Sequence, residues 1–256
     1  MGTFNMVAGA ALLLAAGQAL AGPACSGHSP AHTVALVELY TSEGCSSCPP
    51  ADAYLGGLRA AGVGPAQAVL LSLHVDYWNY IGWKDPFSRK AFSERQRALA
   101  DLAGTRTIYT PGFFVGGREL RDWRNKLPAV VAASNRQPAQ AAIGIGLGPA
   151  TGAGVQVDVT ATAAKAGTLH VALVESALAV KVGAGENDGR LLRHDFVVRE
   201  WLAPQSLGRD GKAALSQLLA LPAGARAANL AVSAFVQGEG GTILQAYTLP
   251  LCAPGS

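Results

Sequence analysis

The chain has 256 residues and a mass of 26.2 kDa, and half of its residues are hydrophobic. Charged residues make up 14%, well below the roughly 25% of an average soluble domain, which excludes disordered polyelectrolytes, while the absence of a repeat excludes collagen-like and long heptad architectures. The net charge of +3, without any run rich in lysine and arginine, predicts no nucleic-acid partner.

The N-terminal segment has the pattern of a secretory signal peptide. Residues 6–20 are apolar apart from Gly17 and Gln18, and they are too few for the roughly twenty residues that span a bilayer. Small residues at Ala19 and Ala21 suit a cleavage site, so we expect residues 1–21 to be removed near Ala21. Residues 1–5 carry no lysine or arginine, although a signal peptide usually begins with a positively charged residue. The alternatives are therefore an apolar tail or a misassigned start codon. The mature protein is expected in the periplasm or secreted, with no membrane span.

Strand and helix patterns alternate over residues 30–137. The expected elements are, in order, a buried strand at 34–40, a helix near 51–58, a buried strand at 68–75, a helix from Asp85-Pro86 to Gly104, a hairpin at 113–120 and a helix at 123–134. This alternation predicts an α/β domain.

Short β-like runs separated by glycine-rich turns follow the linker at 136–138. They lie at 141–147, 155–162, 168–180, 191–201, 213–221, 229–237 and 242–251. This spacing is typical of an antiparallel sandwich, so we expect an all-β, sandwich-like domain at residues 141–252.

Four cysteines allow three pairings. Cys45 and Cys48 form a C-x-x-C motif, whereas Cys25 and Cys252 stand near the two ends of the mature chain. Because chain ends often lie close together, we expect Cys25 to pair with Cys252 and Cys45 with Cys48. Unpaired thiols at the ends, or lipid modification of Cys25, are the alternatives.

The C-x-x-C motif is the part of the sequence that carries chemistry. Pro49 and Pro50 suit a first helical turn and so place both cysteines at a helix N-terminus, where N–H groups and the helix dipole favour a thiolate. We expect Cys45 to be the more exposed, attacking sulfur and Cys48 the resolving one. A static disulfide is an alternative. A Cu(I) site built from Cys45, Cys48 and His74 is another, because soft thiolates bind Cu(I).

The strand, C-x-x-C and helix, followed downstream by Thr110-Pro111 before a hairpin, resemble the thioredoxin superfamily. In that family a cis-proline faces the dithiol and its neighbours pair with the bound substrate, which implies this role for Pro111. A buried acid in the first strand helps proton transfer there, and Glu38 matches it; pairing of Glu38 with an arginine is the alternative.

Four blocks resemble more closely the bacterial exported DUF1223 proteins, a thioredoxin-like family of unassigned function. The first block comprises residues 38–42 and 44–52, and the second comprises 74–78 and 82–87. The third comprises 104–106 and 109–111, and the fourth comprises 185–187, 189–190 and 197–199. The resemblance implies a thioredoxin-like α/β domain at 30–137 followed by the β-sandwich domain. Gly44 replaces the aromatic residue common before the first cysteine, and Ser46-Ser47 contains no proline. These departures leave open whether the protein acts as oxidase, reductase or isomerase.

Further candidate residues follow the second strand and precede Pro111. We expect His74, Asp76, Trp78, Tyr109 and Thr110 to line a substrate cleft beside the dithiol, although packing between domains is the alternative. The polar loop at 186–190 is predicted to be a turn, with a contact to the dithiol cleft as the second possibility.

The leading hypothesis is an exported thiol–disulfide oxidoreductase that acts on protein or peptide thiols and disulfides. Thiolate attack itself needs neither a metal nor an organic cofactor. A non-catalytic binding scaffold with a structural disulfide, and a copper-binding protein, are the competing hypotheses.

Overall fold

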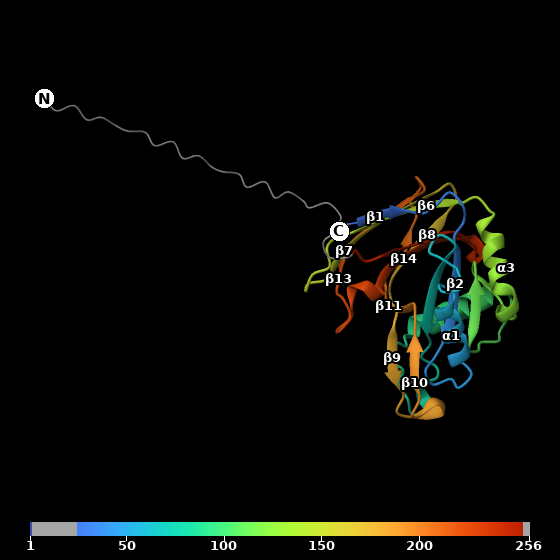
Figure 1. Ribbon diagram of the computed structural model, residues 1–256. Coiled ribbons are helices and arrows are strands. Elements are labelled where there is room, and N and C mark those ends of the chain that lie inside the picture. Colours follow the sequence, from blue (N-terminus) through green and yellow to red (C-terminus); the bar gives the residue numbers. More distant parts are fainter. Residues whose placement is uncertain (2–24, 253–256) are drawn as a thin grey trace.

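The computed structural model describes Met1 and residues 25–252, so nearly all of the expected signal peptide lies outside the described residues. The described chain is mostly β, with fifteen strands and three α-helices arranged around one large curled sheet (Figure 1).

The elements have the following bounds. The strands are β1 (Cys25–His28), β2 (Ala35–Thr41), β3 (Ala68–His74), β4 (Gly112–Val115), β5 (Arg118–Glu119), β6 (Ala141–Leu147), β7 (Val155–Ala163), β8 (Gly167–Glu175), β9 (Leu178–Lys181), β10 (Leu191–His194), β11 (Val197–Trp201), β12 (Gln205–Ser206), β13 (Lys212–Leu219), β14 (Leu230–Gly238) and β15 (Ile243–Pro250). The helices are α1 (Pro49–Gly57), α2 (Lys90–Leu102) and α3 (Trp123–Asn135).

Strands β2 and β3 lie at the centre of the sheet that carries the C-x-x-C motif. They run parallel, and every residue of both is buried. Their sequences are nearly continuous apolar runs because both faces are covered, as is usual for parallel strands. The odd-numbered residues of β2 face α1 and α3, whereas Leu36 and Tyr40 face the side of α2.

The expected fold class, an α/β thioredoxin-like domain followed by an all-β sandwich-like domain, is wrong. The sheet that begins with β2 and β3 continues into the C-terminal half of the chain, in the order β15-β14-β8-β11-β3-β2-β4-β5, with β12 paired to β8. Strand β11 pairs with β3 in parallel, and the Ser72 N–H donates to the Phe196 carbonyl at 2.8 Å. Sequence periodicity marks strands but not their partners, so it did not reveal that the two halves share one β-rich sheet.

A second sheet, ordered β1-β6-β7-β13, packs on the β8, β14 and β15 part of the large sheet. The facing side chains are alternate apolar residues, as in Ile143, Val157, Val171 and Val232, and this two-sheet arrangement is consistent with a β-sandwich. The Cys25–Cys252 disulfide ties the start of β1 to the residues after β15, with a Cα–Cα distance of 5.9 Å.

Helix α2 begins at Lys90, four residues later than expected with Asp85 as the cap and Pro86 as the first helical residue. The Asp85 carboxylate does not cap a helix. It accepts hydrogen bonds from the N–H groups of Glu43 and Phe87 and from His74. The expected hairpin near 113–120 is present as β4 and β5, and α3 continues through Pro128.

Two long β-like runs predicted at 168–180 and 191–201 are each broken in the structure. Ala177 and Phe196 adopt positive φ angles of 59° and 57°, which L-residues rarely adopt. The Asp195 carboxylate accepts the Ala177 N–H at 2.9 Å and so supports this bend. The hairpin β9–β10 therefore leaves the large sheet and extends at the end of the molecule away from β1 and β6 (Figure 1).

Candidate functional site

Cys45 and Cys48 form a disulfide directly before α1, with a Cα–Cα distance of 5.4 Å. Cys48 is the N-cap of the helix, and Pro49 and Pro50 occupy its first turn. Because these prolines carry no N–H, the helix end offers fewer free donors than expected; the N–H groups of Ala51 and Asp52 bond to the Cys48 carbonyl. The Ser47 hydroxyl lies 3.3 Å from the Cys45 sulfur and donates a hydrogen bond to it.

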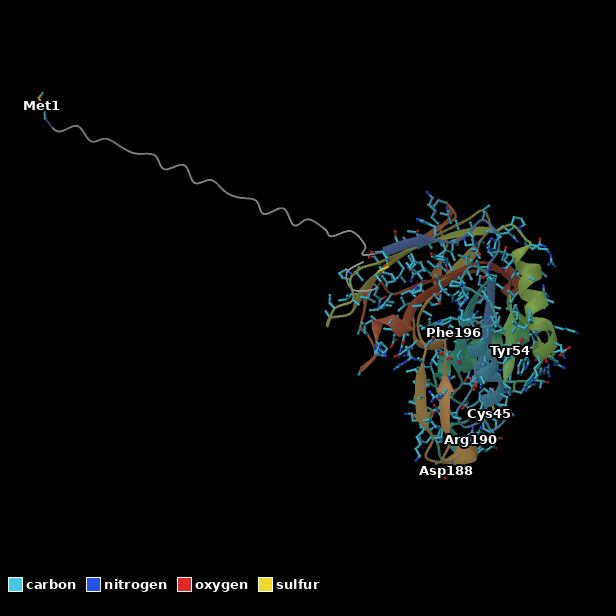
Figure 2. The ribbon with its side chains drawn as sticks, viewed as in Figure 1. Met1, Cys45, Tyr54, Asp188, Arg190 and Phe196 are labelled. Carbon is cyan, nitrogen blue, oxygen red and sulfur yellow. A yellow bond between two sulfur atoms is a disulfide. The ribbon has the colours of Figure 1, made fainter. Side chains whose placement is uncertain are left out.

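Both cysteines are buried, at 1% exposure for Cys45 and 0% for Cys48. The expected difference in exposure between the two sulfurs is therefore small, and neither is open to solvent in this state. Figure 2 shows Cys45 at the same end of the molecule as Asp188 and Arg190, in the tip of hairpin β9–β10. We call residues 182–190 of this tip the cover.

The cover holds the C-x-x-C loop through polar contacts. The side chain of Asn187, itself fully buried, donates to the carbonyl oxygens of Glu43 at 2.8 Å and Cys45 at 3.0 Å. The Glu186 carboxylate accepts the Ser46 N–H at 3.0 Å, and hydrogen bonding from the Ser46 side chain and then from its backbone lowers the pKa of Glu186. The loop predicted at 186–190 is thus both a turn and a contact with the dithiol loop.

The aromatic segment after β3 packs beside the C-x-x-C loop. A Cβ on Gly44 would lie 3.2 Å from the Cβ of Trp78, which explains why an aromatic side chain has no room at position 44. The Trp78 indole N–H donates to the Thr110 hydroxyl at 2.7 Å. The Thr110–Pro111 peptide bond is cis, as the resemblance implies. Trp78 therefore links Thr110 and Pro111 to the cysteine loop.

Other predicted site residues have partners elsewhere. The Asp76 carboxylate accepts from Ser93, and the Tyr109 hydroxyl bonds to Glu119. Neither contact involves the C-x-x-C loop, so the structure does not bring these two functional groups to it.

Glu38 is fully buried and bound by Arg95 through two hydrogen bonds, at 2.6 and 3.1 Å. Burial opposes the charge on Arg95, but the Glu38 carboxylate outweighs it and raises the pKa of Arg95. Glu38 points to the α2 side of β2, whereas α1 packs on the other face. The structure therefore places Glu38 in an ion pair with Arg95, on the face of β2 opposite α1.

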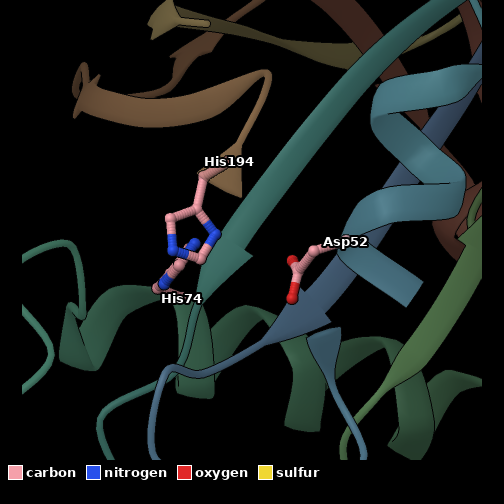
Figure 3. A group of neighbouring side chains, drawn as sticks. All are labelled: Asp52, His74 and His194. Atoms are coloured by element: carbon pink, nitrogen blue, oxygen red, sulfur yellow. The ribbon is translucent and has the colours of Figure 1, made fainter. Parts of the chain in front are cut away.

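A second group of polar side chains is buried beside α1. Asp52 of α1, His74 of β3 and His194 of β10 point toward one another, with one potential ligand atom from each within 4.8 Å of the others (Figure 3). Their exposures are 8%, 0% and 2%. Asp85 and Glu43, both buried, stand behind the two histidines, and we call these five residues the buried cluster.

The hydrogen bonds fix the histidine tautomers. His74 bonds through Nδ1 to Asp85 at 2.7 Å, and His194 bonds through Nε2 to Glu43 at 3.0 Å. Because carboxylates accept hydrogen bonds, these two nitrogens carry the protons, and His74 Nε2 and His194 Nδ1 hold lone pairs when the rings are neutral. Neither of these nitrogens has a hydrogen-bond partner among the described residues.

Burial and charge shift the pKa values of Asp52, His74 and Asp85. Desolvation raises the pKa of Asp52 to about 6, against the opposing effect of the two histidines. Burial alone would lower the pKa of His74, but Asp85 outweighs it and raises that pKa. Burial alone would raise the pKa of Asp85, but His74 and two backbone N–H groups lower it.

Sequence reasoning missed His194 entirely, assigned no role to Glu43 or Asp52, and interpreted Asp85 as a helix cap. His194 lies inside a run that has the pattern of an ordinary strand. A signal was available for Asp52 and Asp85, since both lie in blocks that resemble DUF1223, but their partners come from distant segments.

The sequence model for "Protein of unknown function (DUF1223)" matches residues 36–237. The chain belongs to this family. No curated protein matches it.

Two solved structures are similar. One is a crystal structure of a protein from Agrobacterium tumefaciens, 26% identical, with a TM-score of 0.62 over 88% of this chain and 98% of that one. The other is HBP35 of Porphyromonas gingivalis, 17% identical, with a TM-score of 0.61 over 87% of this chain and 76% of that one. The second likeness concerns the fold alone.

The two disulfides are typical of proteins in oxidising compartments and are consistent with an exported protein. Among residues 25–252, no helix is long and apolar enough to cross a membrane.

Proposed function

We propose that this protein is a thiol–disulfide oxidoreductase whose Cys45–Cys48 pair reacts when the cover moves away. The observation that carries the proposal is the position of the disulfide: it is bonded, lies at the N-terminus of α1 and belongs to a loop that the tip of a hairpin contacts through hydrogen bonds. Core cysteines far from any loop would have no such route to a partner.

Only a few hydrogen bonds attach the cover to the C-x-x-C loop, which favours local opening. Its direct hydrogen bonds to the C-x-x-C loop are the two from Asn187 and the one to Glu186. Three hydrogen bonds contribute roughly 0.5–1.5 kcal/mol each, a range that local opening of a surface hairpin can supply.

In the reaction, a thiolate of the partner attacks the Cys45 sulfur. The Cys45–Cys48 bond breaks, Cys48 leaves as a thiolate, and a mixed disulfide forms between the partner and Cys45. A second thiolate then attacks the partner's sulfur and releases Cys45, which leaves the protein reduced and the partner oxidised. The reverse sequence reduces a partner disulfide. The Ser47 hydroxyl supports the Cys45 thiolate by donating a hydrogen bond.

The test is a redox titration of the full chain combined with an activity assay. We expect the Cys45–Cys48 pair to have a reduction potential above about −300 mV, so that it converts between thiol and disulfide in glutathione buffers. Structural disulfides have lower reduction potentials and stay oxidised in the same buffers. Cys45→Ser should abolish insulin reduction and dithiol oxidation. Cys48→Ser should trap a mixed disulfide, whereas the Cys25→Ser/Cys252→Ser control should stay active. Full activity in Cys45→Ser would refute the proposal.

A binding scaffold with a locked disulfide is the second candidate function, and the 0–1% exposure of the two cysteines favours it. The same titration separates the two: a pair that stays oxidised in glutathione buffers, while the chain remains folded, supports the scaffold. The Cu(I) set is not formed in this state, because Cys45 and Cys48 are bonded to each other and His74 faces Asp85.

A further inference from the structure

We propose that Asp52, His74 and His194 bind one divalent transition-metal ion. The geometry that points to this site is the convergence of one carboxylate and two histidines from three separate elements, α1, β3 and β10 (Figure 3). Two histidines and one carboxylate are a ligand set that imidazole-binding metals such as Zn²⁺ and Fe²⁺ use.

The histidines are already arranged as ligands. Each donates one ring N–H to a buried carboxylate, His74 to Asp85 and His194 to Glu43. This carboxylate–histidine pairing is the usual outer shell of a metal site, because it fixes the tautomer and orients the free nitrogen toward the ion. The free nitrogens, His74 Nε2 and His194 Nδ1, find no other partner among the described residues.

The charge of the buried cluster also suits a cation. Three buried carboxylates, Glu43, Asp52 and Asp85, face two histidines that are neutral when they act as ligands. Buried charges are stable when they are paired or coordinate a metal. A divalent ion would neutralise two of the three negative charges.

The spacing suits a single ion. Bonds of about 2.0–2.2 Å place two ligands of one ion at most about 4.4 Å apart, and the potential ligand atoms of the three residues lie within 4.8 Å of one another. A cleft of about 430 Å³ between α1 and β10, lined by Asp52 and His194 among others, gives an ion a path from solvent. Three protein ligands leave a coordination position for water or a small molecule from that cleft.

The test measures metal binding by the oxidised full chain after treatment with a chelator. Titration with Zn²⁺, and with Co²⁺ as a spectroscopic probe, should show one equivalent bound and a melting temperature that rises with metal concentration. His194→Gln and Asp52→Asn should each lose stoichiometric binding, and Asp85→Asn should weaken it about 10- to 100-fold. Circular dichroism identifies any variant that fails to fold, and the conclusion then rests on the others.

Two controls make the result specific. His170→Gln changes another histidine with an unpartnered ring nitrogen, located outside the cluster, and should bind metal like the unchanged chain. Cys45→Ser/Cys48→Ser should also bind one equivalent, which separates this site from the thiols and from the proposed redox function. No stoichiometric binding by the folded chain, or unchanged binding in both His194→Gln and Asp52→Asn, would overturn the proposal.

Discussion

Replacing Asn187 with alanine should make the Cys45–Cys48 disulfide react faster with small thiols. The Asn187 amide donates to the carbonyl oxygens of Glu43 and Cys45, and its oxygen accepts from Arg190. The change removes the two bonds that attach the cover to the C-x-x-C loop, while the remaining Glu186 contact is exposed to solvent.

The two lost hydrogen bonds are worth about 1–3 kcal/mol together, at roughly 0.5–1.5 kcal/mol each. If the disulfide reacts only from the open state, the open population and the rate of reduction rise about 5- to 150-fold. Other contacts of the cover are unchanged, including the buried side chain of Val182, so the hairpin itself should persist.

The assay is reduction by dithiothreitol under native conditions, followed by alkylation and mass spectrometry of each cysteine pair. The Cys25–Cys252 disulfide serves as an internal reference, because it joins the start of β1 to the residues after β15 and lies outside the loop that the cover contacts. Asn125→Ala, which removes an exposed asparagine contact on α3, is the matched control. An unchanged rate at Cys45–Cys48, or an equal acceleration at Cys25–Cys252, would refute the idea that the cover controls access.

Four further outcomes follow from the structure. Ser47→Ala should raise the pKa of the Cys45 thiol in the reduced protein, measured by the pH dependence of alkylation, because the nearby hydroxyl is lost; an unchanged pKa would contradict the assigned contact. Arg95→Leu should destabilise the fold by about 3–5 kcal/mol in urea unfolding, since it strands the buried Glu38 carboxylate, whereas Glu38→Gln should leave the rate of disulfide reduction unchanged. Ala177→Gly should raise the unfolding free energy by about 1 kcal/mol, because φ is 59° there; a loss of stability would show that the bend is not strained. Burial, aided by Arg95, lowers the pKa of His170 to about 3, so as the pH falls the unfolded chain binds this proton before the folded chain does. Between pH 6.5 and pH 3 the free energy of unfolding should therefore fall by about 1.4 kcal/mol per pH unit more in the unchanged chain than in His170→Gln.

The buried cluster and the disulfide are connected through the same hairpin. His194 lies on β10, and the cover that hydrogen-bonds to the Cys45 carbonyl is the tip between β9 and β10. A ligand held by His194, His74 and Asp52 would tie this hairpin to α1 and β3. The two proposals can nevertheless fail separately, since one concerns thiol exchange and the other metal binding by the oxidised chain.

Sequence alone determined the local features of this protein. The apolar runs identified β2, β3 and β6, the glycines at 116 and 117 marked the turn between β4 and β5, and the C-x-x-C motif with two following prolines placed the disulfide at the start of α1. The blocks quoted from the sequence also identified the family. Each of these features depends on neighbouring residues or on short sequence motifs, and both can be identified from the sequence directly.

Tertiary structure decided everything that joins distant segments. Whether β11 pairs with β3, whether Glu38 meets Arg95, and whether His194 meets Asp52 depends on packing between residues that lie tens to more than a hundred positions apart. The bends at Ala177 and Phe196 also follow from such packing, because neither residue favours a positive φ by itself. The contact between the cysteine loop and the hairpin belongs to the same class, since Asn187 lies 142 residues downstream of the Cys45 carbonyl that it binds.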